Sequence, residues 1–499
     1  MDANTTKTTV WSLAFACSQL LACSSQTSVT PGAQPMGATT SPSTAAAPAA
    51  VGSATVPPTP ATSMSMTPVA MSTGVAGSSV ASSGGRGGAS SVAAVGGAGT
   101  VAGAAGRSAA ASGTSGATAG ASGTVAMAGA GGAGTTPATA EAPGCDGAKL
   151  LVTPDDPGAR GPWAVGAKTV TLKLAGGMTT VEVWYPAQLG SEAGKTKAGY
   201  DLTEWLSASD KAKIPAAENT PQPCDCYRDL PIDAAHGPYP AVVFAHGLAA
   251  FRTGSRTTMT HWASRGFIVL AADHLGVNLR DFAASQCGGQ GSGVSQISYL
   301  ADINAEIAAL KSKPAELSFL GDRVDSAHIG AGGHSMGAGT GATAVTGVQA
   351  IVLLAELLGA SPSASPGLKG VVSIAGMDDS VTTYAATASA YDGAPQPKWL
   401  VGMKGGDHLD VIDICSQTNE KGQTSLDVGM KNGVCAINAV LALAHCGTMS
   451  EPKQGPGIVN YVSTAVLEQA LQCKDRSAEL ADAALKAKFS AVAEYKHSP

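Results

Sequence analysis

The residues best suited by type and spacing to do chemistry lie in the run Gly333-His334-Ser335-Met336-Gly337, a Gly-x-Ser-x-Gly pattern. An apolar run that is typical of a buried strand precedes it, and small residues typical of a helix follow it. At a strand-to-helix junction this pattern forms a nucleophile elbow, a tight turn whose strained backbone holds a serine hydroxyl out of the sheet. A chance match is the alternative, but the Gly/Ser-rich N-terminal third contains no second copy. The pattern therefore predicts Ser335 as a nucleophile.

A serine nucleophile needs a base to take its proton, and the base needs an acid to orient it. In elbow folds the chain order is Ser, acid, His, which leaves His408, His445 and His497 as candidates. His497 lies near a chain end that we expect to fray, and His445 follows an apolar run that resembles a helix end. His408 follows the last expected parallel strand in a glycine-containing loop, so we predict His408 as the base; the alternative is a surface histidine in a polar turn.

The acid should follow a strand end, and the expected strand Val371–Ala375 leads into Asp378 and Asp379. The Gly-x-x-Asp spacing favours Asp379, with Asp378 in solvent or capping the next helix. Asp407 adjoins the base in sequence, and such a neighbour rarely points at the imidazole ring. We therefore predict Asp379 as the residue that fixes the histidine tautomer.

Two backbone N–H groups should face the negative charge that develops on the substrate carbonyl oxygen. We expect one from Met336, directly after the nucleophile, and one from Leu248, in the loop after the strand Ala241–Ala245. His246 is predicted to hold that loop, and His334 to pack beneath the elbow. Three further charged residues near strand ends are expected to order loops: Arg252, Arg256 and Asp273.

Short apolar runs alternate with helix-like segments along the second part of the chain. The expected strands are 168–174, 180–185, 241–245, 267–272, 328–332, 351–355, 371–375 and 398–403, and the expected helices 257–265, 298–310, 336–345, 381–391, 459–472 and 477–495. The first two strands alternate apolar and polar residues, as an antiparallel edge hairpin does, and the rest resemble buried parallel strands. The pattern predicts an α/β fold, a doubly wound, mostly parallel sheet whose N-terminal strands are antiparallel.

Composition divides the chain of 499 residues into three parts. Residues 1–22 are a predicted signal peptide, residues 23–143 a linker of Ala, Gly, Ser, Thr and Pro, and residues 144–499 one catalytic domain. The linker lacks the large apolar side chains that would offset the entropy of ordering it; a glycosylated stalk is the alternative. The net charge of -6 shows no basic excess, so we expect no nucleic-acid partner.

The N-terminal apolar segment is too short to span a membrane. Leu20-Leu21-Ala22-Cys23 resembles a bacterial lipobox, in which the cysteine carries the lipid, and Ser24 then suggests the outer membrane. We expect an exported outer-membrane lipoprotein anchored through Cys23; the alternative is an ordinary secretory signal and a secreted or cell-surface protein.

The ten cysteines agree with export, because eight remain once Cys17 and Cys23 are set aside. An even number in an exported protein suggests disulfides, although the sequence does not reveal the pairing. Cys224 and Cys226 are expected to pair with other cysteines rather than with each other, and a metal site is the weaker interpretation because no histidine lies at ligand spacing.

Two runs carry a resemblance to a known family: residues 243–252, Val-Phe-Ala-His-Gly-Leu-Ala-Ala-Phe-Arg, and residues 262–269, Trp-Ala-Ser-Arg-Gly-Phe-Ile-Val. They resemble the serine-dependent platelet-activating-factor acetylhydrolases and are similar to dienelactone-hydrolase-like proteins. Residues 321–339, 376–381 and 404–408 also resemble cutinases and polyester hydrolases. The resemblance covers about residues 155–472 and implies an α/β-hydrolase fold, with Ser335, Asp379 and His408 as triad and Leu248 and Met336 as oxyanion donors.

These residues together predict a carboxylic ester hydrolase that requires no cofactor and no metal, and we expect a monomer. Residues 356–366 are too few for a large cap domain, so the cleft should be open to small-molecule, lipid or polymer esters, with residues 409–456 shaping its rim. Leu248 stands where polyester hydrolases often carry an aromatic residue, and dienelactone hydrolases proper use a cysteine nucleophile, which argues against both activities. Two alternatives remain: release of short acyl chains from phospholipids, and a surface-binding module whose catalysis has decayed.

Overall fold

The structure is a computed structural model that describes residues 140–499, except 289–290, 292, 294, 296–297 and 357. The expected signal peptide, the lipidation site Cys23 and almost all of the expected linker lie outside the described residues. A short strand pair, β1 (Glu141–Pro143) with β2 (Lys149–Leu151), opens the described part.

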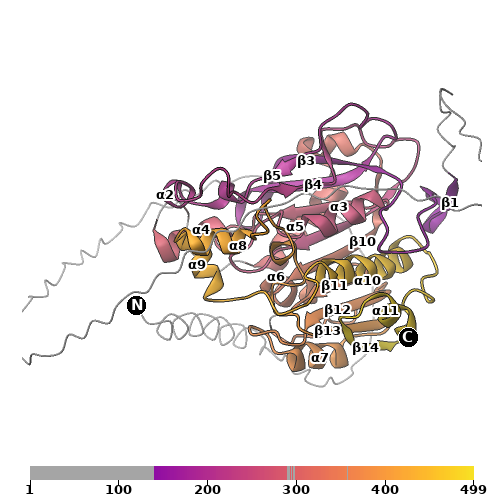
Figure 1. Cartoon of the computed structure of the whole chain (residues 1–499). Coiled ribbons are helices and arrows are strands. Elements are labelled where there is room, and N and C mark those ends of the chain that lie inside the picture. The colour runs from indigo at the N-terminus through magenta and orange to yellow at the C-terminus, as the bar shows by residue number, and fades with distance from the viewer. Residues whose placement is uncertain (1–139, 289–290, 292, 294, 296–297, 357) are drawn as a thin grey trace, which may run out of the picture. The chain divides into compact units, whose positions relative to one another are not determined.

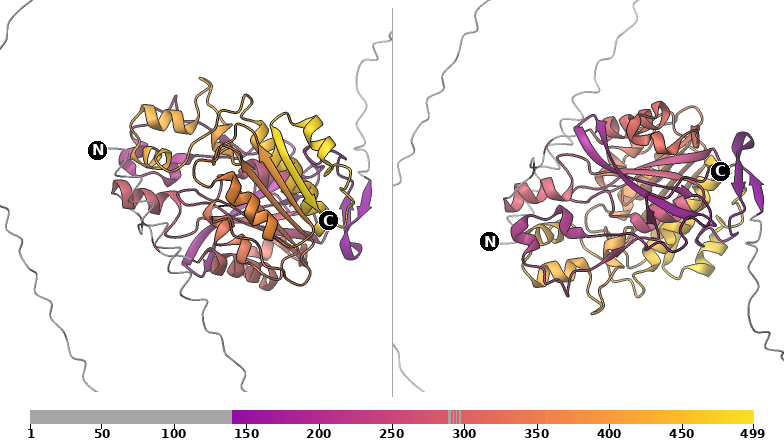
Figure 2. Two further views of the ribbon diagram at one scale, coloured as in Figure 1. Left: turned by 90° about the horizontal axis from the view of Figure 1, so that it is seen from below. Right: turned by 90° about the horizontal axis from the view of Figure 1, so that it is seen from above.

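Within these residues one ten-stranded sheet forms the centre of the fold. In spatial order its strands are β7 (Tyr227–Arg228), β3 (Ala164–Leu174), β4 (Gly177–Ala187), β9 (Ile268–Ala272), β8 (Tyr239–Ala245), β10 (Val324–His334), β11 (Ala350–Leu354), β12 (Gly370–Gly376), β13 (Lys398–Met403) and β14 (Val492–Ser498). The strands from β9 to β13 run parallel, and β3 and β4 form an antiparallel hairpin. Figure 1 shows β3 and β4 at one end of the sheet and β14 at the other, and Figure 2 views the sheet from below and above.

Helices cover both faces of the sheet, as the alternating sequence pattern predicts. The helices are α2 (Ala208–Lys211), α3 (Arg256–Ser264), α4 (Leu279–Cys287), α5 (Tyr299–Ser312), α6 (Met336–Gly339), α7 (Tyr384–Gly393), α8 (Ser425–Lys431), α9 (Cys435–Leu441), α10 (Gln454–Leu471) and α11 (Asp482–Lys488). Apolar side chains of α3 and α10 pack on one face, and those of α5 on the other. This doubly wound arrangement is the α/β-hydrolase fold, which confirms the predicted fold class.

Two predicted helices are wrong in part. The helix expected over 336–345 is the four-residue α6 followed by a 3₁₀ turn at Ala342–Ala344, because the backbone leaves the helical conformation at Gly341, with φ -114° and ψ -80°. The helix expected over 477–495 is only α11, and the chain then continues as β14, which pairs antiparallel with β13. His497 therefore does not lie in a frayed end: it pairs opposite Trp399 and stacks on its indole ring at 4.9 Å.

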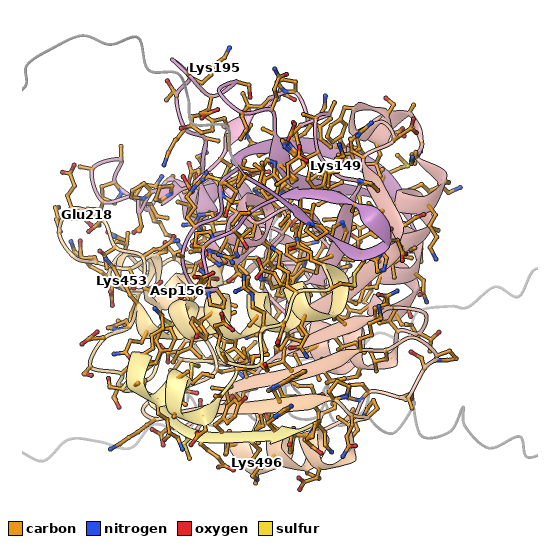
Figure 3. All side chains as sticks on the ribbon, turned by 90° about the vertical axis from the view of Figure 1, so that its right-hand side faces the viewer. Lys149, Asp156, Lys195, Glu218, Lys453 and Lys496 are labelled. Atoms are coloured by element: carbon orange, nitrogen blue, oxygen red, sulfur yellow. A yellow bond between two sulfur atoms is a disulfide. The ribbon has the colours of Figure 1, made fainter. Side chains whose placement is uncertain are left out.

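Short helices α2, α4, α8 and α9 gather on the side of the strand carboxyl ends (Figure 1). Asp210 of α2 accepts hydrogen bonds from the backbone N–H groups of Cys435 and Ala436, where α9 begins. Glu218, which is labelled in Figure 3, accepts from Lys421 and Lys431 of the same segment. These contacts attach part of the expected rim, residues 409–456, to the segment around α2.

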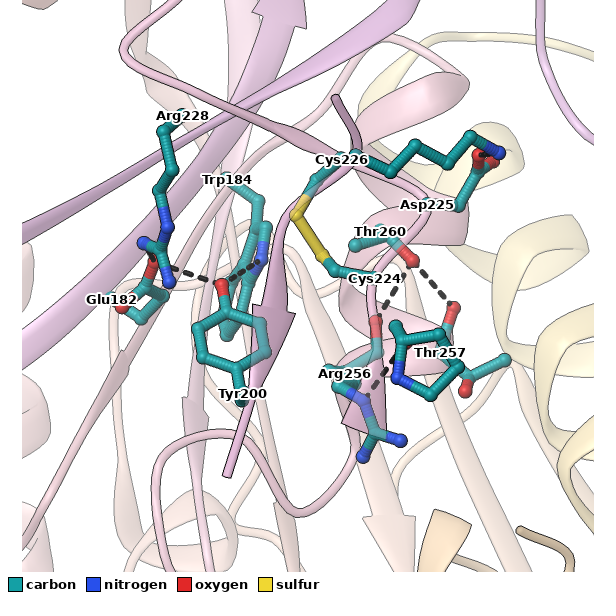
Figure 4. The surroundings of a disulfide bond; sticks show 12 residues. Glu182, Trp184, Tyr200, Cys224, Asp225, Cys226, Arg228, Arg256, Thr257 and Thr260 are labelled. Atoms are coloured by element: carbon teal, nitrogen blue, oxygen red, sulfur yellow. Dashed lines mark hydrogen bonds and ion pairs between the residues drawn. A yellow bond between two sulfur atoms is a disulfide. The ribbon is translucent and has the colours of Figure 1, made fainter. Parts of the chain in front are cut away.

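The eight cysteines of the described part form four disulfides: Cys145–Cys473, Cys224–Cys226, Cys287–Cys435 and Cys415–Cys446. The expectation that Cys224 and Cys226 pair with other cysteines is wrong, because the two bond to each other (Figure 4). Both flank Asp225, whose carboxylate lies between Arg160 and Lys197. Both cysteines are buried, and both bond to the backbone of Ala198: the Cys224 N–H donates to the Ala198 carbonyl, and the Ala198 N–H donates to the Cys226 carbonyl.

Candidate active site

Ser335 lies at the junction between β10 and α6, on the turn that the Gly-x-Ser-x-Gly pattern predicts. Its backbone has φ 54° and ψ -120°, a region that costs a non-glycine residue about 1–3 kcal/mol. The turn also requires its glycines: a Cβ at Gly333 would lie 2.5 Å from the carbonyl carbon of Gly337, and a Cβ at Gly337 would lie 2.4 Å from the Ala245 carbonyl oxygen. The Ser335 N–H donates to the Leu354 carbonyl at 2.9 Å, which ties the elbow to β11.

His408 follows β13 and brings its imidazole to the serine. The distance from His408 Nε2 to Ser335 Oγ is 2.8 Å. On the other side of the ring, Nδ1 lies 2.9 Å and 3.1 Å from the two carboxylate oxygens of Asp379. A carboxylate only accepts hydrogen bonds, so Nδ1 carries the proton and Nε2 is free to accept the serine proton. All three side chains are buried, and Ser335 is 7 % exposed.

Asp379 sits just past β12, and the backbone holds its carboxylate in place. Its Oδ1 accepts from the N–H groups of Val381 and Thr382, both at 2.8 Å. The neighbouring Asp378 is exposed, and the cap of α7 is Thr383 rather than either aspartate. Asp407 turns its carboxylate toward the backbone N–H groups of Ser380 and His408. Of the candidate acids, the structure brings Asp379 to the ring.

The expected oxyanion donors flank the serine from two elements. Met336 is the first residue of α6, and Leu248 lies in the loop after β8. A Cβ at Gly247 would lie only 2.9 Å from Ser335 Cβ, so this loop passes directly over the nucleophile. Within the described part of the chain, neither the Met336 N–H nor the Leu248 N–H donates to a protein acceptor. Both are therefore available to an oxygen placed beside Ser335.

His246 holds the loop that carries Leu248. Its Nδ1 donates to the Gly247 carbonyl at 2.7 Å, and its Nε2 accepts from the His274 N–H at 3.1 Å. Burial, with a contribution from His274, lowers the pKa of His246 well below its usual value, so the ring is neutral. Because the Gly247 carbonyl and the Leu248 N–H belong to one peptide plane, the bond to His246 fixes the direction of both.

His334 lies beneath the elbow, between the nucleophile strand and the base. Its Nε2 donates to the His408 carbonyl at 3.1 Å. Burial, and then the nearby His408, lower the pKa of His334 to about 3, so this ring also stays neutral. The histidine next to the nucleophile thus supports the backbone of the loop that bears His408.

The charged residues near the strand ends connect loops. Arg252 binds Asp273 at 2.5 Å and Glu204 at 2.8 Å, and its guanidinium lies over the Trp205 ring. Arg256 donates from Nε to the Pro223 carbonyl at 3.1 Å, beside the Cys224–Cys226 disulfide (Figure 4). None of these contacts reaches Ser335.

Two supports of the site have no local sequence signal. The first is Asp410, whose carboxylate accepts hydrogen bonds from the backbone N–H groups of Asp407 and Gly447. The second is the backbone of His445, whose carbonyl accepts from the Leu409 N–H; the side chain of His445, one of the three candidate bases, is exposed. The bonds to Gly447 and from Leu409 join segments far apart in the chain, so the sequence could not show which residues meet there.

No candidate metal site is found in the described ranges, because no three His, Cys, Asp or Glu side chains come together in a group that could hold an ion. Among the helices of the same ranges, none combines the length and the apolar character that a membrane span needs.

The fold defines the class of protein as an α/β-hydrolase, and it brings the side chains of Ser335, His408 and Asp379 together. A family model described as platelet-activating factor acetylhydrolase, isoform II, matches residues 155–287. The match covers the β3–β4 hairpin and the loop after β8, and it ends before Ser335. No curated protein matches the chain. The chain therefore resembles the serine esterases of this acetylhydrolase family, and the match supports a carboxylic ester hydrolase in general terms.

Proposed function

We propose that the protein hydrolyses carboxylic esters through Ser335, His408 and Asp379 and a covalent acyl-enzyme. The observation that carries the proposal is the continuous hydrogen-bonded chain from Ser335 Oγ to His408 at 2.8 Å and from His408 to Asp379 at 2.9 Å. In such a chain the base removes the serine proton while Oγ attacks the ester carbonyl.

The attack forms a tetrahedral intermediate whose oxygen carries negative charge. The N–H groups of Leu248 and Met336 would bind that oxygen, and removing one such donor typically costs about 10²–10³-fold in rate. His408, now protonated, gives its proton to the leaving alcohol. Water then enters, and His408 takes a proton from it as the water oxygen attacks the acyl carbonyl. The bond from that carbonyl to Ser335 Oγ breaks, His408 returns the proton to Oγ, and the acyl group leaves as the acid.

Reaction with a fluorophosphonate probe tests the mechanism without knowledge of the natural substrate. We expect the full chain to be labelled on Ser335 and to hydrolyse p-nitrophenyl acetate, and Ser335→Ala to lose both. Labelling at another residue, or hydrolysis that persists in Ser335→Ala, would contradict the proposed nucleophile. An unlabelled wild type that still binds surfaces would instead favour a decayed binding module.

The family match favours one narrower activity, release of short acyl chains from phospholipids. A phospholipid with an sn-2 acetyl group and its long-chain analogue, supplied at equal concentration, separate this activity from general esterase activity. Preference for the acetylated lipid supports the narrower activity, and equal rates support a general esterase.

We also propose that the protein is exported and held to a membrane through Cys23. Pairing of all eight cysteines in the described part supports an oxidising compartment. In a bacterial host, incorporation of an alkyne-labelled fatty acid that is lost in Cys23→Ser would support the anchor. Equal labelling of both proteins would contradict it.

A further inference from the structure

The loop that carries the base is fastened to a segment far along the chain. We call residues 404–410 the base loop and residues 444–449, which lie between α9 and α10, the strap. The Leu409 N–H donates to the His445 carbonyl at 3.2 Å, and the Thr448 N–H donates to the Gly405 carbonyl at 2.8 Å. The strap therefore binds the base loop on both sides of His408.

A single carboxylate oxygen completes this connection. Oδ2 of Asp410 accepts from the Asp407 N–H at 2.8 Å and from the Gly447 N–H at 2.6 Å. The first bond closes the turn around His408, and the second joins that turn to the strap. Asp410 is 2 % exposed, and burial raises the pKa of its carboxyl. Within the described residues, the hydrogen bonds of its side chain go to backbone groups, so Asp410 acts on His408 through the loop.

The two segments are packed without spare room. A Cβ at Gly447 would lie 2.1 Å from the Gly405 carbonyl oxygen and 2.7 Å from the Asp407 nitrogen. On the far side, a Cβ at Gly455 in α10 would lie 2.0 Å from the Asp410 carbonyl oxygen. A displacement of the strap would therefore move the base loop as well.

A disulfide fixes the strap to the body of the domain. Cys446, at the centre of the strap, is bonded to Cys415. Cys415 ends a 3₁₀ turn that begins at Asp413, whose carboxylate accepts from the Thr257 N–H of α3 at 2.9 Å. The path from α3 to the strap thus consists of a buried carboxylate, one turn and a covalent bond.

We propose that Asp410 is a positioning residue for His408, and that the Cys415–Cys446 disulfide secures the strap through which it acts. This inference rests on the proposed function, because it assigns the role to His408 as base. The physical reason is that the reaction requires Nε2 within hydrogen-bonding reach of Ser335, and a displacement of about 1 Å can cost about 10²-fold in rate. The carboxylate accepts one hydrogen bond that closes the turn and one that joins the turn to the strap, and the disulfide keeps the second donor, the Gly447 N–H, in place.

The first test compares three variants of the full chain. Asp410→Ala should lower kcat for p-nitrophenyl acetate and the fluorophosphonate labelling rate by about 10- to 100-fold with little change in KM. Asp410→Asn keeps an acceptor oxygen and should recover most of the activity. Asp210→Ala is the matched control, since Asp210 is also buried and also accepts from two backbone N–H groups, but at α9. It should keep the wild-type kcat.

A loss in Asp410→Asn equal to that in Asp410→Ala would show that charge rather than positioning matters, and it would overturn the proposal. Equal kcat values for Asp410→Ala and Asp210→Ala would also overturn it. Circular dichroism and thermal unfolding show whether each variant is folded. If Asp410→Ala is not folded, the kcat of Asp410→Asn relative to wild type and the kcat values of the disulfide variants decide whether the proposal holds.

The second test breaks disulfides in pairs. The Cys415→Ser/Cys446→Ser protein should lose about fivefold or more in kcat at a temperature where it is still folded. The Cys224→Ser/Cys226→Ser protein, whose disulfide does not touch the base loop, should keep its kcat. Equal kcat values in these two proteins would contradict a role for the strap. Labelling of wild-type Ser335 separates the two proposals: its absence refutes the proposed function, whereas labelling at equal rates in wild type and Asp410→Ala refutes only the positioning role.

Discussion

One hydrogen bond joins the elbow around Ser335 to the base loop around His408, but the two regions are held in place by different kinds of contact. The elbow is fixed by neighbours on adjacent strands: Gly337 packs against the Ala245 carbonyl and the Ser335 N–H binds Leu354. The base loop depends on Asp410 and on the strap, which is covalently bonded to Cys415. The nucleophile is therefore placed by the sheet itself, whereas the base is placed by contacts between distant segments.

The two halves of the site should therefore fail in different ways. Overpacking or a clash in the elbow disturbs the sheet and should cost stability together with activity. Loosening of the base loop should lower activity first, since a loop can shift while the core stays packed.

Removing the base gives the largest expected effect. His408→Ala should lower kcat/KM for p-nitrophenyl acetate on the order of 10⁴- to 10⁶-fold, because Ser335 Oγ then has no proton acceptor. Ser335→Ala/His408→Ala should be no less active than either single variant, since the two residues act as one unit. Steady-state kinetics measures this, and losses that multiply would show that the two regions act separately.

Removing the charge of the acid, Asp379, gives the second largest expected effect. Asp379→Asn should lower kcat by about 10⁴-fold, because the amide favours the wrong tautomer of His408. Asp378→Asn is the matched control, since Asp378 is exposed and adjacent in sequence, and its kcat should stay within about twofold of wild type. The reverse order of effects, measured with the same ester, would move the acid to Asp378.

Adding one methyl group to the elbow should lower both the stability of the protein and the reactivity of Ser335. Gly337→Ala places a Cβ 2.4 Å from a backbone oxygen, so it should lower the free energy of unfolding by about 1–3 kcal/mol and slow Ser335 labelling. Gly199→Ala is the control, because its Cβ would meet the nearest atom at 3.7 Å. Urea unfolding and labelling rates measure both effects. If Gly337→Ala lowers the free energy of unfolding but Ser335 is labelled at the wild-type rate, the prediction that stability and reactivity fall together is wrong.

The difference between local contacts, as at the elbow, and distant contacts, as at the base loop, also decides which features the sequence could predict. The parallel strands, the antiparallel hairpin and the turn at Ser335 follow from local apolar runs and glycine spacing, and their positions agree with the structure. Chain order leaves three histidines as candidates, and position after an expected strand end, with the Gly-x-x-Asp spacing, selects His408 and Asp379, which the structure places together. Their catalytic roles remain predictions.

Features that depend on distant partners could not be predicted. The segment Val492–Ser498 has no strong strand signal of its own, but β13 offers unpaired backbone groups at the sheet edge, and pairing there outweighs helix propensity. The Cys224–Cys226 bond is local, but it follows only once the other six cysteines of the described part are known to pair among themselves across long separations. Asp410 and the strap are separated by a helical segment, so no spacing rule links them.

His334 joins the two regions, and the effect expected from it is on stability at low pH rather than on the chemical step. Its pKa of about 3 in the folded protein lies below the usual 6.5, so between these values the unfolded chain binds a proton that the folded protein does not. Stability should therefore fall as pH decreases through this window, by up to about 1.4 kcal/mol per pH unit from this group. His334→Gln has no titrating ring and keeps an N–H donor for the His408 carbonyl, so its urea-unfolding free energy should fall less steeply between pH 6.5 and 4.5. His445→Gln, at an exposed position, should follow wild type. If His334→Gln keeps the wild-type slope, the buried ring is not the link through which acid loosens the contact between elbow and base loop.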